Sequence, residues 1–111
     1  MSMSIYTSGD IAHKCHVSTR TIQYYDKQEI LSPNYTSETN RRFYTDKEVE
    51  KLELILFLKE IGCTIKEIKV LLQEDSSMKT LYTLLQIKKH EIQQSITVKE
   101  NKVRKIEQIQ R

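Results

Sequence analysis

The segment from Val17 to Asp26 concentrates side chains that can contact nucleic acid. A guanidinium can form paired bonds to a phosphate or a guanine edge, an amide can pair with adenine, and phenol hydroxyls can reach phosphate oxygens. Such groups recur at helical spacing on one face, at Thr19, Arg20, Gln23, Tyr24 and Lys27. This pattern is typical of a helix that contacts nucleic acid. A polar helix face is equally typical of a solvated surface, so the segment alone does not decide between the two.

Two short helices joined by a tight turn are predicted for residues 8–27. The hydroxyl of Ser18 is suited to cap the second helix, with Val17 and Ile22 facing inward. The first helix is expected to be capped within Ser8-Gly9-Asp10, and its inner face to comprise Ile11, Ala12 and Cys15. This arrangement is a helix-turn-helix, in which the second helix enters the DNA groove.

A β-hairpin is predicted for residues 33–44. Two short aromatic segments, Tyr35-Thr36 and Arg41-Arg42-Phe43-Tyr44, flank a polar, turn-rich run over residues 37–40. Arg41 and Arg42 are expected at or near the tip of this wing, where both can contact a phosphate backbone.

Two further helices complete the predicted DNA-binding head, residues 1–75. Capping boxes, Thr45 with Glu48 and Thr64 with Glu67, mark their starts. The first is apolar on more than one face, so we expect it to be covered on most sides and to form the core, ending near Gly62. The inner stripe of the second helix comprises Ile65, Ile68, Leu71 and Leu72.

Residues 76–111 predict a long coiled-coil helix. Its heptad seam carries the apolar residues Met78, Tyr82, Leu85, Ile92, Ile96, Val103 and Ile106, and the seam is interrupted by Lys89 and Lys99. A single helix with an uncovered seam is poorly stable in water, so we expect homodimerisation. Packing of the helix back onto its own head is the less favoured alternative, and the pattern leaves parallel and antiparallel pairing open.

The net charge of +3 conceals an uneven distribution. Residues 1–75 carry 10 Lys and Arg against 12 Asp and Glu, whereas residues 76–111 carry 8 against 3. Bulk charge on the head therefore does not argue for DNA. Within the head, however, cations are more frequent over residues 13–45 and acids over residues 46–75, which can orient a polyanion toward one side.

Several classes of function are disfavoured by the sequence. No secretory signal or membrane-spanning run is evident, which indicates a cytoplasmic protein. Cys15 and Cys63 are expected to be reduced thiols, and a helix would turn His13, Cys15 and His16 in different directions, so no metal site is predicted. With no phosphate-binding loop or catalytic constellation, we expect neither an enzyme nor a cofactor.

Residues 5–73 resemble the DNA-binding domain of the MerR family of bacterial transcription regulators. The matching motifs include Val17-Ser18, Tyr24-Tyr25-Asp26, Asn40-Arg41-Arg42-Phe43-Tyr44 and Ile61-Gly62. The resemblance implies a mainly α fold: a winged helix-turn-helix head with a small β-hairpin wing, followed by a long antiparallel dimerisation helix. It also implies binding to a pseudo-palindromic promoter site, with bending and untwisting of the spacer so that RNA polymerase engages both promoter elements.

The resemblance assigns DNA contacts to Thr19, Arg20, Tyr24 and Tyr25 in the second helix, and to Arg41 and Arg42 in the wing. The sequence departs from the family pattern at three positions. Gln23 replaces an arginine, and glycines are replaced by His16 before Val17 and by Ile30 before Leu31.

No effector is indicated by the sequence. Metal-responsive relatives carry cysteines around the dimerisation helix, whereas this chain has none after Cys63, and drug-responsive relatives carry an additional ligand-binding domain. We therefore expect neither a bound metal nor a bound drug. Two other functions remain open: an architectural or recombination-accessory protein that bends DNA without regulating a promoter, and a module whose head binds protein.

Overall fold

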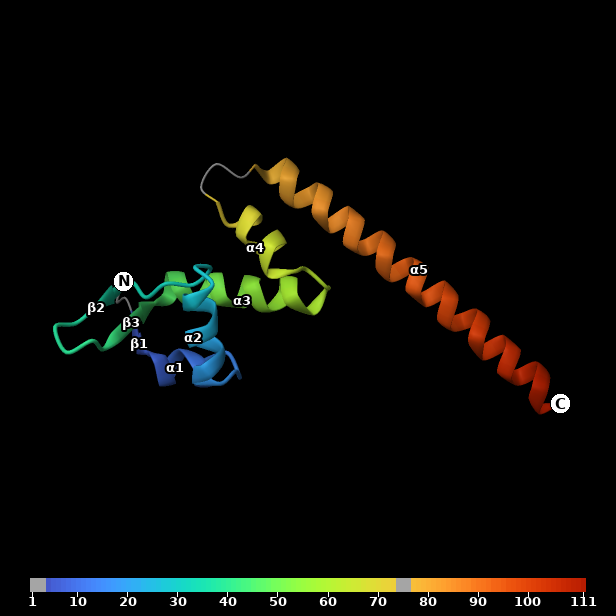
Figure 1. Cartoon of the computed structure of the whole chain (residues 1–111), viewed down its shortest axis with the longest axis horizontal. Helices are drawn as coiled ribbons and strands as arrows, with labels where there is room; N and C mark the ends of the chain where they lie inside the picture. Colours follow the sequence, from blue (N-terminus) through green and yellow to red (C-terminus); the bar gives the residue numbers. More distant parts are fainter. Residues whose placement is uncertain (1–3, 74–76) are drawn as a thin grey trace. The chain divides into compact units, whose positions relative to one another are not determined.

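The computed structural model describes residues 4–73 and 77–111, and the chain divides into two compact units (Figure 1). Met1–Gln73 forms the head, and Glu74–Arg111 contains one long helix. The mainly α fold expected from the sequence, a winged helix-turn-helix followed by a long helix, is confirmed. The predicted boundary between residues 75 and 76 lies outside the described residues.

The helix-turn-helix consists of α1 (Ser8–Lys14) and α2 (Thr19–Lys27). The hydroxyl of Ser18 accepts a hydrogen bond from the Thr21 N–H at 3.1 Å, which confirms the expected cap of α2. The cap of α1 lies one residue earlier than predicted, at Thr7. Its hydroxyl accepts from the Asp10 N–H, and the Asp10 carboxylate accepts from the Thr7 N–H, each at 3.1 Å.

Both turns that flank α2 contain a residue in the left-handed region. His16 has φ 57° and Glu29 has φ 63°. An L side chain at such a position crowds the following carbonyl, which is why glycine is favoured there. In the turn after α2, the left-handed residue is Glu29, whereas Ile30, which the resemblance aligns with a family glycine, is buried in the core.

The sheet is antiparallel and contains one strand that the sequence did not predict. The hairpin of β2 (Tyr35–Thr36) and β3 (Arg42–Thr45) lies where a wing was expected. β1 (Ile5–Thr7) pairs with the other edge of β3 and gives the order β1-β3-β2. The wing turn is closed at Ser37, whose hydroxyl accepts from the Arg41 N–H at 3.1 Å.

The core of the head includes one face of α3 (Asp46–Glu60), and α4 (Ile65–Leu71) follows this helix in the chain. Glu48 is buried, but its carboxylate accepts from the N–H and the hydroxyl of Thr45 at 2.7 and 2.9 Å. One face of α3 is fully packed, comprising Val49, Leu52, Ile55 and Leu58.

The expectation that α3 is covered on most sides was wrong. Leu54 and Phe57 on α3 are 39% and 50% exposed. The helix does end where predicted. Gly62 adopts φ 98° just after the last turn, and its N–H donates a hydrogen bond to the Lys59 carbonyl at 3.1 Å.

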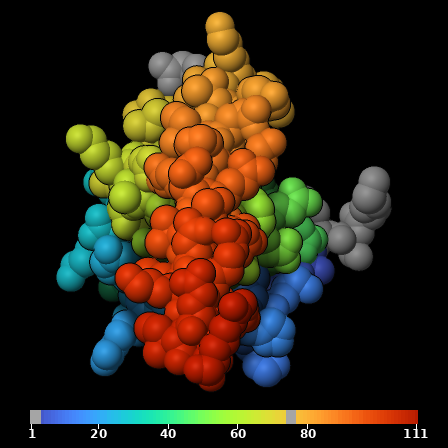
Figure 2. Space-filling view, turned by 90° about the vertical axis from the view of Figure 1, so that its right-hand side faces the viewer, coloured from blue at the N-terminus to red at the C-terminus, as the bar shows by residue number. Residues whose placement is uncertain are grey.

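The second unit is α5 (Met78–Gln110), a helix of 33 residues capped by Ser77. Of the predicted dimerisation residues, Leu85 is half-buried, and the others are exposed on its surface: Met78, Tyr82, Ile92, Ile96, Val103 and Ile106. The side chains of α5 form the orange and red surface in Figure 2. None of the helices within residues 4–73 and 77–111 combines the length and the hydropathy of a bilayer span.

Candidate nucleic-acid interface

A groove of about 890 Å³ is formed where α2, the start of α1 and the wing meet. It is lined by three groups of residues: Arg20, Gln23, Tyr24, Asp26 and Lys27 from α2; Asn40, Arg41 and Arg42 from the wing; and Thr7, Ser8 and Gly9 from the start of α1. Four of these side chains are cationic and one is a carboxylate. The head as a whole is not basic, but this surface is, and it therefore favours a polyanion.

The outer face of α2 contributes most of the predicted contact residues. Thr19, Arg20, Gln23, Tyr24 and Lys27 are all exposed, as the helical spacing predicted. Ile22 is completely buried and anchors the opposite face to the core. The helix is therefore fixed to the head by one side while its polar side remains open to a ligand.

Tyr25 occupies a different environment from the other predicted contact residues. It is only 6% exposed, and burial raises the pKa of its phenol. Its ring centre lies 5.8 Å from that of Tyr24, which is 46% exposed. The resemblance assigned a DNA contact to Tyr25, but the structure buries this side chain, because Tyr25 follows Ile22 by three residues and shares its inward face.

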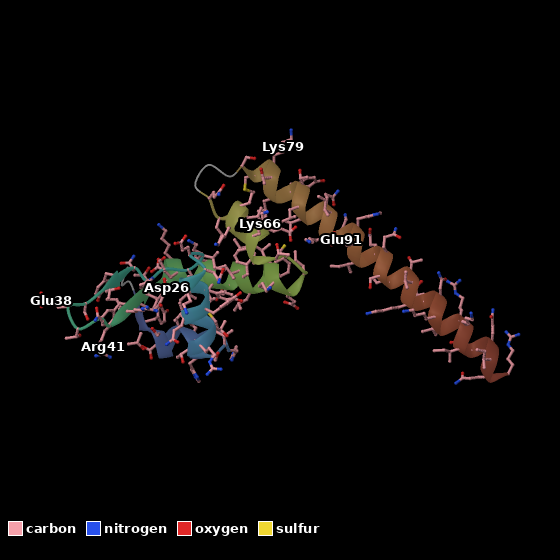
Figure 3. The ribbon with its side chains drawn as sticks, in the orientation of Figure 1. Asp26, Glu38, Arg41, Lys66, Lys79 and Glu91 are labelled. Atoms are coloured by element: carbon pink, nitrogen blue, oxygen red, sulfur yellow. The ribbon has the colours of Figure 1, made fainter. Side chains whose placement is uncertain are left out.

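The two adjacent wing arginines have different surroundings. Arg41 precedes β3, and its guanidinium carbon lies 5.9 Å from the centre of the Phe43 ring, which in turn stacks on Tyr35 at 4.8 Å. Arg42 is the first residue of β3, and its Nη1 lies 2.9 Å from Oδ2 of Asp26 on α2. In Figure 3, Arg41 is labelled at the wing and Asp26 on the body of the head.

A buried tyrosine lies beneath the ion pair. Tyr44 on β3 is completely buried, and loss of solvation raises the pKa of its phenol above the ordinary value of 10.0. Ser8 and Arg42 are close enough to offset part of that rise, while the charge of Asp26 adds to it. Tyr44 thus lies close to Ser8 and to the ion pair, although it does not line the groove itself.

The cysteines lie apart from this groove. Cys63 is buried, and half-burial raises the pKa of the Cys15 thiol. In the part of the chain that the structure describes, no three His, Cys, Asp or Glu side chains are grouped so as to hold a metal ion.

Five groove residues were not identified from the sequence: Thr7, Ser8, Gly9, Asp26 and Asn40. Asn40 adjoins the predicted arginines, so the same turn signal could have included it. The residues at the start of α1 reach the groove because β1 pairs with β3, a long-range contact that no local pattern records.

Comparison with known proteins agrees with this geometry. Residues 6–75 match the family model described as MerR HTH family regulatory protein. The Multidrug-efflux transporter 1 regulator of Bacillus subtilis is 31% identical over 97 residues, which cover 86% of this chain and 34% of that protein. The chain spans between about a quarter and two fifths of the length of three curated relatives that it matches.

Two solved structures are similar over nearly the whole chain. The N-terminal part of the Bacillus subtilis multidrug transporter activator, MtaN, gives a TM-score of 0.76 at 30% identity, covering 93% of this chain and 95% of that one. HiNmlR, a MerR family regulator lacking the sensor domain and bound to promoter DNA, gives 0.73 at 26% identity, covering 94% and 86%.

Proposed function

Since this chain belongs to the MerR family of helix-turn-helix regulatory proteins, we propose that it is a transcription regulator that binds a pseudo-palindromic promoter site as a homodimer. Members of this family are regulators rather than enzymes, which agrees with the expectation from the sequence. In this proposal each head occupies one half-site, with α2 in the major groove and the wing on the adjacent backbone.

The observation that carries the proposal is the groove between α2 and the wing. Arg20 and Gln23 stand on the exposed face of α2 and have the donors and acceptors that recognise guanine and adenine edges. Lys27 and Arg41 flank them with charges suited to phosphates. One surface thus combines groups for base recognition with groups for backbone binding, as a sequence-specific DNA-binding protein requires.

Dimerisation through α5 is the second part of the proposal. Its exposed seam, including Ile92, Ile96 and Val103, needs a partner, and an identical helix provides a matching surface. Two heads connected in this way bind two half-sites on one duplex, whose pseudo-palindrome mirrors the two-fold symmetry of the dimer.

Control of transcription is proposed to follow from deformation of the DNA. Bending a short site by 40–90° costs about 1–6 kcal/mol, a cost that the contacts of two heads can offset. Bending and untwisting the spacer would align two promoter elements for RNA polymerase, which makes the polymerase an indirect partner. No residue set in the described chain points to an effector.

The test is a binding titration with promoter fragments from the protein's own gene and its neighbours. Arg20→Ala should weaken binding to the preferred fragment by about 1–3 kcal/mol and relax sequence preference. Arg104→Ala, an exposed arginine on α5, is the matched control and should leave the preference unchanged.

Three outcomes would count against the proposal. Absence of any sequence preference in the native protein would contradict promoter recognition, and an affinity insensitive to salt would favour a protein ligand instead. DNA bending without any change in RNA polymerase output would favour the architectural function.

A further inference from the structure

The ion pair between Asp26 and Arg42 connects the two elements that the proposed function brings to DNA. Asp26 lies in the last turn of α2, and Arg42 opens β3 of the wing. Their side chains are 22% and 41% exposed, and both line the groove. Asp26 is the one carboxylate among the groove-lining residues of the described chain. The negative charge of Asp26 repels DNA phosphates, so its presence in a groove that is proposed to bind DNA suggests a specific role.

The geometry shows that Asp26 acts on one wing arginine and not on the other. The distance from Arg42 Nη1 to Asp26 Oδ2 is 2.9 Å, as expected for a charge-assisted hydrogen bond. Arg41 lies instead over the ring of Phe43. In the structure the two guanidinium groups therefore have different partners, the ring of Phe43 for Arg41 and the carboxylate of Asp26 for Arg42. The charge of Arg42 is thus offset in the free protein, while that of Arg41 is not offset by Asp26.

We propose that Asp26 is a positioning residue that holds Arg42 ready for a DNA phosphate while limiting its attraction to arbitrary duplex. This inference rests on the proposed DNA binding. On non-matching DNA, Arg42 would exchange the carboxylate of Asp26 for a loosely placed phosphate. The affinity would increase little, because one anion replaces another. At a matching site, α2 is seated and brings the backbone to the wing, so Arg42 turns its remaining N–H donors to a fixed phosphate. Asp26 therefore lowers non-specific affinity more than specific affinity.

The first test is the substitution Asp26→Asn, which keeps the shape of the side chain and removes its charge. Titration against a mixed-sequence duplex at low salt should show about 5-fold tighter binding, and the slope of log K against log salt should steepen by about one ion. Binding to the preferred promoter fragment should strengthen less, so that the specificity ratio falls. Glu50→Gln removes the same charge from the exposed side of α3, outside the groove, and should change each affinity by less than about 2-fold.

The second test compares the two arginines directly. Arg41→Gln should weaken binding to the mixed-sequence duplex more than Arg42→Gln, because the charge of Arg42 is already offset by Asp26. In the Arg42→Gln background, Asp26→Asn should strengthen binding less than it does in the native background, because only the direct repulsion between Asp26 and DNA is then removed. If thermal melting shows that Asp26→Asn does not fold, the comparison of Arg41→Gln with Arg42→Gln decides the question alone.

The outcomes separate this inference from the proposed function. If the native protein binds DNA but Asp26→Asn behaves like Glu50→Gln, or keeps its full effect without Arg42, the role of Asp26 is overturned and DNA binding stands. Equal losses for Arg41→Gln and Arg42→Gln on mixed-sequence duplex also overturn it. If the native protein does not bind duplex DNA, both proposals fail together.

Discussion

The head and α5 differ in how their apolar side chains are covered. The head buries its own core, in which residues such as Ile22, Leu52 and Tyr44 are completely inaccessible. On α5, by contrast, nine large apolar side chains are at least 44% exposed. The head has the packing of a self-contained fold, whereas α5 leaves a row of apolar side chains uncovered. Under the proposed function, one chain would suffice to recognise a half-site, and a second chain would be needed to bind two half-sites at once.

The largest effect is expected from a charge in the seam of α5. Ile96→Asp should weaken the proposed dimer by at least about a hundredfold, because each dimer would bury two unpaired carboxylates. Sedimentation at micromolar concentration measures the mass directly. Gln94→Asp introduces the same charge on the outer side of the helix and should leave the mass unchanged. An unaltered dimer in Ile96→Asp would show that the seam is assigned to the wrong face.

A matched pair of leucines tests the opposite property of the head. Leu52→Ala should destabilise the head by about 2–5 kcal/mol, since Leu52 is completely buried and its removal leaves a cavity. Leu54→Ala on the same helix should cost far less, because Leu54 is 39% exposed. Denaturant unfolding of both variants gives the comparison. Similar losses for the two would mean that the exposed side of α3 is also covered in solution.

The strained turn after α2 offers a stabilising change. Glu29→Gly should raise the free energy of unfolding by about 1 kcal/mol, because glycine adopts φ near 63° without a steric penalty. Gln28→Gly, one residue earlier in an ordinary helical conformation, should instead destabilise the head slightly. Thermal melting compares the two, and a loss of stability in Glu29→Gly would contradict the assigned strain.

The smallest effect is expected at alkaline pH. Burial raises the pKa of Tyr44 in the folded head, so the unfolded chain releases this proton first as pH passes about 10, and stability then falls. Below that pH the contribution is constant. Tyr44→Phe should reduce this alkaline decline in the free energy of unfolding, which is at most about 1.4 kcal/mol per pH unit for each proton. At pH 7 the same substitution should alter the free energy of unfolding by less than about 1 kcal/mol. Denaturant unfolding between pH 7 and 11 measures it, and an unchanged alkaline decline would contradict the assignment.

The elements predicted correctly from the sequence depend on local chemistry. The cap at Ser18, the boxes at Thr45 and Thr64, and the stop at Gly62 each involve residues only a few positions apart. The cap at Thr7 was missed although its partner Asp10 has the same three-residue spacing, so this signal was available.

The features that were missed depend on tertiary structure. β1 has three residues and forms only because Ile5 pairs with Thr45, forty positions away. The ion pair of Asp26 with Arg42 likewise requires α2 and the wing to be folded together. Tyr25 is different, because the resemblance alone implies its DNA contact, whereas helical periodicity places Tyr25 beside the buried Ile22.

The central claim is that two heads, paired through α5, recognise duplex DNA with the outer face of α2. Selection of duplexes by the native protein from a random pool tests it most directly, because no target needs to be assumed. We predict enrichment of two inverted half-sites at a fixed spacing, each bound by one chain. Enrichment of a single isolated half-site, or of no sequence at all, would contradict the account.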